Sequence, residues 1–284
     1  MQRATLSSTS IFLHVLFVCG GCILSSRAFF LPSRATEDHT TMSALSSVSA
    51  EPKLLVSHFH QISSTSGPDA KIRLVLASQS PRRTEILQMM GLGGRFTATP
   101  SPLDEEKLQI ELSKQQLSPS DYARTLAERK AHAYGVEAAD FSTDWSVTLI
   151  IGCDTIVDLN GKIMEKPSNE DVAYTMLSSL SDNWHQVHTG VAVYAVESSR
   201  SDNEPRLMFS FTDTARVKFC ALTDRDIKAY IDTKEPFDKA GSYGIQGIGG
   251  QLVERIEGDF FTVMGLPMHR LSRELTETLK CLEL

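Results

Sequence analysis

Two arginines stand directly after a serine–proline pair, in the segment Ser-Gln-Ser-Pro-Arg-Arg that begins at Ser78. Ser80 is a favourable N-cap and Pro81 a favourable first helical residue, so Arg82 and Arg83 fall in the first turn of a predicted helix. The helix dipole disfavours cations at that end, whereas the free backbone N–H groups there bind anions. We therefore predict that Ser78, Ser80, Arg82 and Arg83 bind phosphate. Two solvated surface arginines are the alternative, which the strand–turn–helix setting disfavours.

A single carboxylate interrupts the apolar run Leu-Ile-Ile-Gly-Cys-Asp-Thr-Ile-Val, which begins at Leu149. Burying a carboxylate is unfavourable unless it is paired, bound to a metal or protonated. Because a strand is predicted over residues 146–151, Asp154 would follow its end, where open α/β sheets bind ligands. Asp154 is therefore a candidate site residue, and a turn or capping aspartate is the alternative.

Three other polar segments give weaker signals. Glu105 lies in the acidic run that begins at Asp104, and such runs are usually solvated. Lys166 precedes Pro167, which fixes the chain before a helix, but an isolated lysine is usually a solvated charge. Gln246 lies in a glycine-rich stretch, and its amide offers both donors and an acceptor to the edge of a base. Each segment becomes informative only together with the others.

The histidines and cysteines show no zinc-type spacing. His185 and His188 are three residues apart in a predicted strand, so they face different directions. Beyond residue 22, the cysteines are Cys153, Cys220 and Cys281, which we expect to be reduced thiols.

Helical and strand signals alternate along most of the chain without internal repeats, which predicts an α/β fold. Helices are expected after the N-caps Ser118, Ser168 and Thr223, and over the C-terminal leucines from Leu271 to Leu282, which are expected to pack in the core or a dimer. Strands are expected over residues 72–76, 146–151, 187–196, 207–219 and 252–263, with a hairpin loop over 197–206.

The first 69 residues differ in composition from the rest. Residues 1–28 hold an early arginine, a short apolar run and small residues, in the order of a secretory signal, with a signal-anchor helix as the alternative. Residues 29–69 form a transit-like and linker segment that we expect to be disordered. Together they resemble bipartite plastid-targeting leaders, which indicates an organellar protein. Met42 as an internal start would instead give a cytoplasmic form. The remaining residues, 70–284, are expected to form one domain.

The 284-residue chain carries a formal net charge of −7. Binding of a polynucleotide depends on many Lys and Arg contacts to phosphate, so this charge argues against a nucleic-acid-binding module. It does not argue against a small phosphorylated ligand that arrives with a divalent cation. We also expect no stable membrane association of the mature domain.

Six ordered blocks resemble the Maf family of nucleoside triphosphate pyrophosphatases. They are residues 78–83, 152–155, 165–167, 185–191, 235–247 and 263–267. The resemblance implies an α/β fold with an elongated mixed β-sheet, flanking helices and two lobes around a deep active-site cleft, as in inosine triphosphate pyrophosphatases. It also implies a homodimer, which is the usual state of the family.

The resemblance further implies a reaction, namely hydrolysis of a nucleoside triphosphate to the monophosphate and pyrophosphate with Mg²⁺ or Mn²⁺. Asp154 would then activate the attacking water, and Lys166 would offset charge on the phosphate oxygens. Glu105 and Asp154 would hold the metal. The implied role is house-cleaning of the nucleotide pool.

Arg82, Thr155 and Gln246 match three base-facing positions in the family branch that acts on dTTP and UTP. A neutral amide can pair with the uracil or thymine edge, whereas the carboxylate of the 7-methyl-GTP branch would suit a cationic purine. We therefore expect dTTP, UTP and modified pyrimidine nucleotides as substrates, with a 7-methyl-GTP-type pyrophosphatase as the alternative. A non-catalytic nucleotide-binding regulator of cell division is a second alternative, which the presence of both Asp154 and Lys166 disfavours.

Overall fold

The computed structural model describes residues 54–62, 72–138, 145–199 and 204–282. The predicted leader, residues 1–28, and most of the predicted segment 29–69 lie outside the described residues. Part of that segment forms a short 3-10 helix, η1 (Leu55–Gln61). Leu55 and Ile62 are buried in the main hydrophobic core, and Ile62 forms a β-bridge with Ile72. The folded body therefore begins before residue 70, and residues 54–62 are not the disordered linker that their composition predicts.

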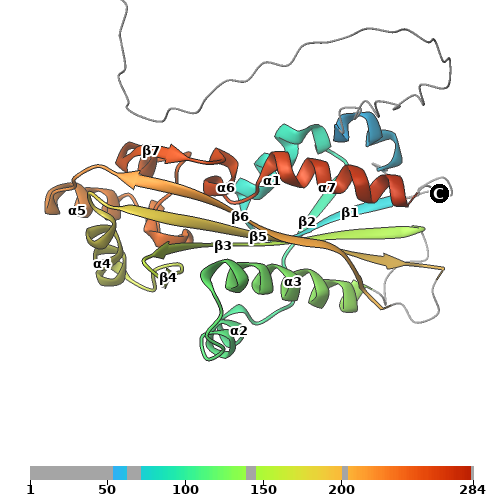
Figure 1. Ribbon diagram of the computed structural model, residues 1–284, viewed down its shortest axis with the longest axis horizontal. Helices are drawn as coiled ribbons and strands as arrows, with labels where there is room; N and C mark the ends of the chain where they lie inside the picture. Colours follow the sequence, from blue (N-terminus) through green and yellow to red (C-terminus); the bar gives the residue numbers. More distant parts are fainter. Residues whose placement is uncertain (1–53, 63–71, 139–144, 200–203, 283–284) are drawn as a thin grey trace, which may run out of the picture. The chain divides into compact units, whose positions relative to one another are not determined.

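A seven-stranded mixed sheet forms the centre of the body, in the order β2-β1-β3-β5-β6-β7 with β4 paired to β3 (Figure 1). The strands are β1 (Ile72–Ala77), β2 (Phe96–Thr99), β3 (Val147–Leu159), β4 (Lys162–Met164), β5 (Trp184–Glu197), β6 (Arg206–Phe219) and β7 (Val253–Glu257). β1 is parallel to β2 and β3, and the remaining described pairs are antiparallel. The predicted α/β class is confirmed.

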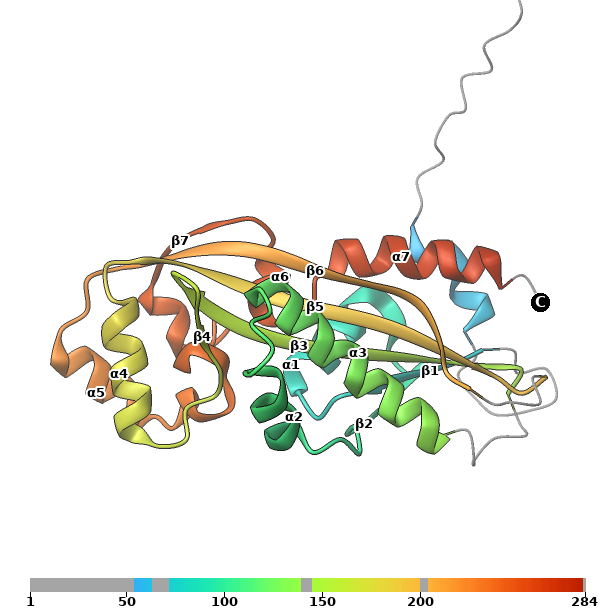
Figure 2. The ribbon, with the colours of Figure 1, turned by 60° about the horizontal axis from the view of Figure 1, so that its bottom comes forward.

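Helices cover both faces of the sheet. They are α1 (Pro81–Leu87), α2 (Glu105–Leu112), α3 (Pro119–Ala138), α4 (Glu170–Leu180), α5 (Asp224–Asp232), α6 (Phe260–Met264) and α7 (Met268–Cys281), with a π-helical turn η2 (Gln88–Leu92) after α1 and 3-10 turns η3 (Glu235–Asp238), η4 (Ala240–Ser242) and η5 (Ile248–Leu252). α3 lies against one face, and α7 lies against the other (Figure 2). Within the described ranges, no helix combines the length and hydropathy that a bilayer span requires.

Among the described residues, the core consists of four hydrophobic clusters, two of which are large. The main cluster joins β1, β3 and β5 to α1 and α7, and it includes Leu271, Leu275 and Leu279. The prediction that the C-terminal leucines form a packing stripe is therefore correct. The second cluster packs α4 and α5 against the C-terminal ends of β3 and β6 and the N-terminal end of β5.

Helix α3 approaches the sheet unusually closely. Its residues Ala123, Ala127 and Ala131 recur every four positions, so they share one helix face, and all three are fully buried. Two strand glycines lie opposite this face. A Cβ placed on Gly152 would lie 2.2 Å from the Ala127 carbonyl oxygen, and one on Gly190 would lie 2.2 Å from that of Ala123. Only glycine at these two positions permits the observed spacing.

Of the four predicted capping residues, two make the expected side-chain hydrogen bonds, and Ser80 and Ser168 do not. The Ser118 Oγ accepts a hydrogen bond from the Asp121 N–H at 3.1 Å, and Thr223 forms a capping box at the start of α5. The prediction of Ser168 as a cap is wrong by one residue, because the Asn169 Oδ1 accepts from the Val172 N–H at 2.9 Å.

Two strand predictions are wrong at their ends. The strand expected over 146–151 continues to Leu159, since it pairs with β5 along its whole length. The strand expected over 252–263 ends at Glu257. After it, Gly258 adopts a positive φ and Asp259 caps α6. Helix α2 and the short strands β2 and β4 are not among the predicted elements.

Replacing Gly190 with alanine should force α3 away from the sheet, because the added methyl group meets a backbone carbonyl that cannot move aside. We expect the free energy of unfolding to fall by about 1–3 kcal/mol, measured by urea denaturation. Gly93→Ala is the matched control, since a Cβ there has no atom within 4 Å and the residue has an ordinary φ of −51°. Equal urea midpoints for the two variants would contradict the close packing of α3.

Candidate active site

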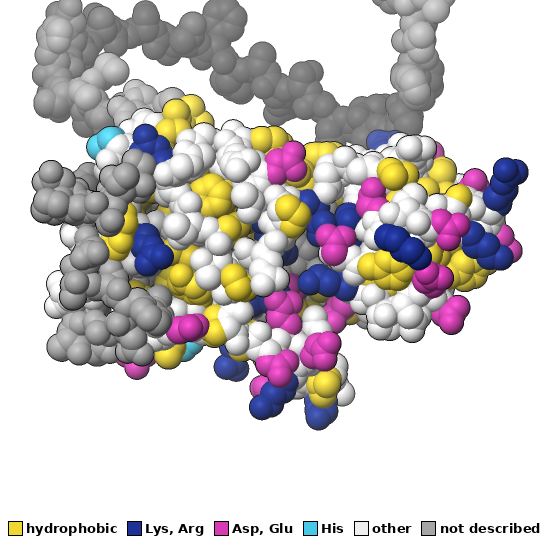
Figure 3. All heavy atoms as spheres, turned by 180° about the vertical axis from the view of Figure 1, so that it is seen from behind, with side chains coloured by type: hydrophobic (Ala, Val, Ile, Leu, Met, Phe, Trp, Pro, Cys, Tyr) yellow, Lys and Arg dark blue, Asp and Glu magenta, His cyan; other side chains and the backbone are white. Residues whose placement is uncertain are grey.

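A pocket of about 470 Å³ brings together all the site residues predicted from the sequence. These are Ser78, Ser80, Arg82, Arg83, Glu105, Asp154, Thr155, Lys166 and Gln246. They come from the β1–α1 turn, α1, α2, β3, the loop after β4 and the loop before η5. Basic and acidic side chains lie side by side around the hollow in this face of the molecule (Figure 3).

The pocket opens where one edge of β3 has no neighbouring strand. β1 pairs with β3 as far as Ile151, and β4 pairs with it from Val157 onward. Adjacent residues of a strand point to opposite faces, yet both Asp154 and Thr155 reach the pocket at this gap. Asp154 therefore lies within β3 and not beyond its end as the sequence predicts. β1, whose last residue Ala77 lines the pocket, is instead the strand that ends there.

Arg83 is held by three protein acceptors. Its Nη1 donates to the Ser78 Oγ at 3.1 Å, its Nη2 donates to the Thr155 Oγ1 at 3.1 Å, and its Nε donates to the Gly265 carbonyl oxygen at 3.0 Å. The helix begins at Pro81 as predicted, but the hydroxyl of Ser80 makes no capping bond. The first-turn arginine is thus fixed at the pocket wall by atoms of three elements.

Arg82 points across the pocket to a residue that the sequence gave no reason to single out. Its Nη1 lies 2.8 Å from the Asp238 Oδ2, and its Nη2 donates to the Asp238 carbonyl oxygen at 3.1 Å. The Lys239 Nζ lies 2.5 Å from the other carboxylate oxygen of Asp238. The Asp238 side chain is 59% exposed, so this bridge stands at the pocket mouth.

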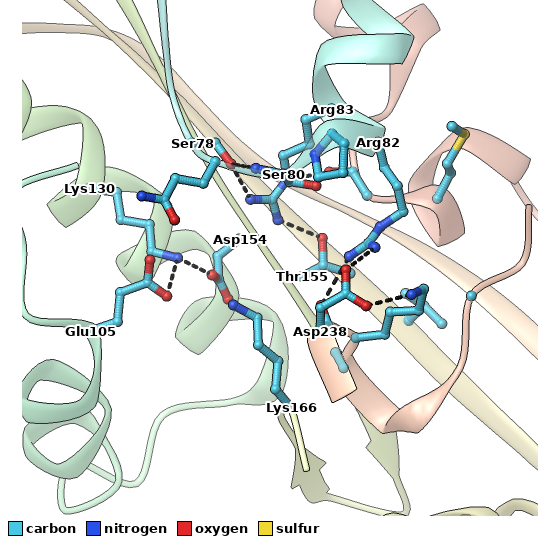
Figure 4. A pocket seen from close by; sticks show the side chains of 18 of the residues that line it. Ser78, Ser80, Arg82, Arg83, Glu105, Lys130, Asp154, Thr155, Lys166 and Asp238 are labelled. Atoms are coloured by element: carbon cyan, nitrogen blue, oxygen red, sulfur yellow. Dashed lines mark hydrogen bonds and ion pairs between the residues drawn. The ribbon is translucent and has the colours of Figure 1, made fainter. Parts of the chain in front are cut away.

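Lys130 is the main functional residue that the sequence analysis missed. Its Nζ lies 2.5 Å from the Asp154 Oδ1 and 3.1 Å from the Glu105 Oε2 (Figure 4). The Lys130 side chain is only 5% exposed, and that of Asp154 is 13% exposed. Burial lowers the pKa of Lys130, but the two carboxylates raise it, and the net shift is upward. Lys130 is therefore charged at neutral pH.

A signal for Lys130 is present in the sequence. It lies on the buried face of α3, whose other buried side chains are those of the hydrophobic residues Tyr122, Ala123, Leu126, Ala127 and Ala131. A lysine on a buried helical face requires an acidic partner.

Lys166 points toward Asp154 from the opposite side of the pocket (Figure 4). Its neighbour Glu165 anchors this loop twice, because the Tyr122 hydroxyl donates to the Glu165 carboxylate and the Gly241 N–H donates to the Glu165 carbonyl oxygen at 3.1 Å. Burial raises the pKa of Glu165. The loop that presents Lys166 is thus tied to both α3 and η4.

The histidines make hydrogen bonds inside the fold. The His185 Nε2 lies 2.8 Å from the Tyr243 hydroxyl, and the His188 Nδ1 lies 2.8 Å from the Thr214 hydroxyl. In the described part of the chain, no group of three or more His, Cys, Asp or Glu side chains is placed to hold a metal ion. Glu105 and Asp154 place two carboxylates around the Lys130 ammonium group.

The three described cysteines are free thiols. Cys153 is buried beside Asp154, and its Sγ lies 3.1 Å from the Gly265 carbonyl oxygen. Burial raises the pKa of the Cys153 thiol to about 11. Cys281 is exposed on α7.

Residues 73–278 match the family model described as Maf-like protein. This chain belongs to the Maf-like protein family. It is 40% identical over 206 residues to the dTTP/UTP pyrophosphatase of Carboxydothermus hydrogenoformans, an alignment that covers 72% of this chain and 98% of that protein. It is 41% identical over 203 residues to the dTTP/UTP pyrophosphatase of Methylobacillus flagellatus, which covers 72% and 91%. The same-named protein of Aquifex aeolicus is 39% identical over 206 residues, which covers 72% and 95%.

In this Maf-like protein, Lys130→Met should be strongly destabilising, because it leaves the partly buried Asp154 without its ammonium partner. We expect the free energy of unfolding at pH 7 to fall by about 3 kcal/mol. The pKa of Lys130 in the folded protein is raised above its ordinary value of 10.5. The ion pairs therefore contribute fully to the free energy of unfolding below pH 10.5, and this contribution is lost as the pH rises through the pKa of the folded state. The difference between the two proteins should therefore be constant from pH 7 to pH 9, measured by urea denaturation. Lys114→Met, at an exposed position of the chain, is the control, and an equal loss in both variants would contradict the role of the pair.

Proposed function

We propose that this Maf-like protein hydrolyses dTTP, UTP and modified pyrimidine nucleoside triphosphates to the monophosphate and pyrophosphate, as a house-cleaning enzyme of the nucleotide pool. The observation that carries the proposal is the convergence of basic side chains and one partly buried carboxylate in a single pocket. The names of the relatives, dTTP/UTP pyrophosphatases, support the same substrates.

The charge of the pocket suits a polyphosphate. Its lining has five basic side chains and three acidic ones, whereas the chain as a whole has a net charge of −7. The basic residues are Arg82, Arg83, Lys130, Lys166 and Lys239, and the acidic ones are Glu105, Asp154 and Asp238. Phosphoryl transfer depends mainly on positioning and on stabilisation of charge, which guanidinium and ammonium groups supply. Ser78, Ser80, Arg82 and Arg83 would bind the triphosphate.

Asp154 is the candidate general base. Its Oδ1 accepts a hydrogen bond from the Lys130 Nζ at 2.5 Å, which fixes the orientation of the carboxylate. The carboxylate would orient a water molecule for attack on phosphorus and accept its proton. Lys166, which points toward Asp154 from the other side, would stabilise the negative charge that grows on the phosphate oxygens.

The donor set near Asp154 fits a divalent metal that arrives with the substrate. Mg²⁺ is usually bound through one or two carboxylates together with substrate phosphates, and the pocket offers the carboxylates of Glu105 and Asp154. When bound, Mg²⁺ or Mn²⁺ would neutralise charge on the phosphates. Lys130 keeps the two carboxylates close together before the substrate binds.

Arg82, Thr155 and Gln246 line the same pocket and are the candidates for recognition of the base. We also infer a homodimer from the family resemblance, and an organelle-targeting leader from the composition of residues 1–28. Light scattering tests the first. A fluorescent fusion of residues 1–66, compared with one that starts at Met42, distinguishes organellar from cytoplasmic protein.

The proposed reaction is tested with a panel of nucleoside triphosphates offered to the full chain with Mg²⁺, with released pyrophosphate as the readout. We expect dTTP and UTP to be turned over fastest, and EDTA to abolish turnover because the triphosphate then lacks its counter-cation. A preference for 7-methyl-GTP would favour the other family branch. Binding of nucleotides without pyrophosphate release would indicate a regulator.

Asp154→Asn should lower kcat by about 10²- to 10⁴-fold, since an amide cannot accept the proton of the attacking water. The variant should still unfold cooperatively and still bind UMP. Asp232→Asn is the matched control, because Asp232 is exposed at the end of α5 and does not line the pocket. Retention of most turnover by Asp154→Asn would refute the assignment of the base.

A further inference from the structure

A chain of hydroxyl groups runs from the pocket into the core. Thr155 and Thr189 are directly opposite each other in the β3–β5 pair, and their Oγ1 atoms lie 3.0 Å apart. The Thr189 Oγ1 in turn donates to the Thr262 carbonyl oxygen in α6 at 2.8 Å. Thr189 is fully buried, so its side chain does not reach a ligand, whereas Thr155 lines the pocket.

The direction of these hydrogen bonds is fixed. A carbonyl oxygen only accepts, and a hydroxyl has one proton to donate, so the proton of Thr189 is committed to Thr262. Thr155 must therefore donate its own proton to Thr189. The Arg83 Nη2 donates to the Thr155 Oγ1 at 3.1 Å, which occupies one of its lone pairs. Toward the pocket, Thr155 is left with a lone pair and no proton.

This polarity restricts what Thr155 can bind. Phosphate oxygens that are deprotonated at pH 8 accept hydrogen bonds and donate none, so an acceptor-only hydroxyl cannot bind them. A substrate group that binds Thr155 must therefore carry an N–H or O–H group, and in a nucleoside triphosphate such groups occur only in the nucleoside part. Because Thr155 is one of the residues proposed to recognise the base, we take the base as its partner. Uracil and thymine carry an N–H at N3, whereas cytosine has a lone pair at N3.

We propose that Thr189 is a specificity-determining positioning residue, which makes Thr155 an obligatory acceptor for the N3–H of uracil or thymine and thereby excludes cytosine. The inference rests on the proposed function. It explains the preference of the enzyme for uracil and thymine by the buried hydroxyl of Thr189. Without the hydroxyl of Thr189, the proton of Thr155 is free to turn toward the pocket and donate to N3 of cytosine.

The first test uses the unaltered full chain. UTP, CTP and N3-methyl-UTP are compared by kcat/KM for pyrophosphate release at pH 8. We expect CTP and N3-methyl-UTP to be poorer than UTP by about 5- to 150-fold, the scale set by one unmatched buried hydrogen bond. If N3-methyl-UTP is hydrolysed as well as UTP, Thr155 does not bind N3–H and the inference is overturned. If no nucleoside triphosphate releases pyrophosphate, the proposed function itself fails.

The second test addresses Thr189 directly. Thr189→Val, which keeps the shape and removes the hydroxyl, should lower the ratio of kcat/KM for UTP to that for CTP by about 5-fold or more. Thr189→Ser keeps a hydroxyl and should preserve the ratio. Circular dichroism melting checks that both variants are folded, and the wild-type comparison stands if Thr189→Val does not fold. An unchanged ratio in a folded, active Thr189→Val protein overturns the inference, since a merely structural threonine would change turnover of both substrates equally.

Discussion

A carboxylate inside a β-sheet requires a partner in place of water, and Lys130 is the partner of Asp154. The ammonium group arrives from α3, and α3 can come close enough only because Gly152 and Gly190 present no side chain to it. A helix displaced outward by one methyl group would separate the two charges. The distance from α3 to β3 and β5 thus determines both the packing of the small residues and the contact between Lys130 and Asp154.

The unpaired edge of β3 lets side chains of this strand reach the pocket. β1 stops and β4 starts on the same side of β3, and the interval between them exposes side chains of both sheet faces. Asp154 reaches the pocket from the α3 side, and Thr155 reaches it from the side of Arg83 and α6. The carboxylate of Asp154 and the hydroxyl of Thr155 are therefore adjacent in sequence but belong to different hydrogen-bond networks.

Local signals in the sequence predicted local structure well. The helix start at Pro81 and the caps at Ser118 and Thr223 depend on neighbouring residues, and the structure has them there. The α/β class follows from alternating patterns in the same way. The strand expected to end at residue 151 continues instead, because pairing with β5 overrides the break that Gly152 and Asp154 suggest.

Contacts between distant segments could not be predicted. Lys130 and Asp238 are separated from Asp154 and Arg82 by 24 and 156 residues, and no local pattern records either pairing. The direction of the Thr155 hydroxyl depends on the Thr262 carbonyl group in α6, which is also distant from Thr155 in sequence. The first-turn arginines and Asp154 are unusual for their positions, whereas the roles predicted for Glu105, Thr155, Lys166 and Gln246 rest on the family resemblance.

The buried thiol of Cys153 can report local opening of the structure around β3. Alkylating reagents attack thiolates, and this sulfur is both shielded from solvent and kept protonated at neutral pH. It becomes reactive only when α6 and β3 part, which is the motion that would also release Arg83 from Gly265. The rate of its labelling, followed by mass spectrometry beside the exposed Cys281, therefore measures how often the contacts between β3, Arg83 and Gly265 open.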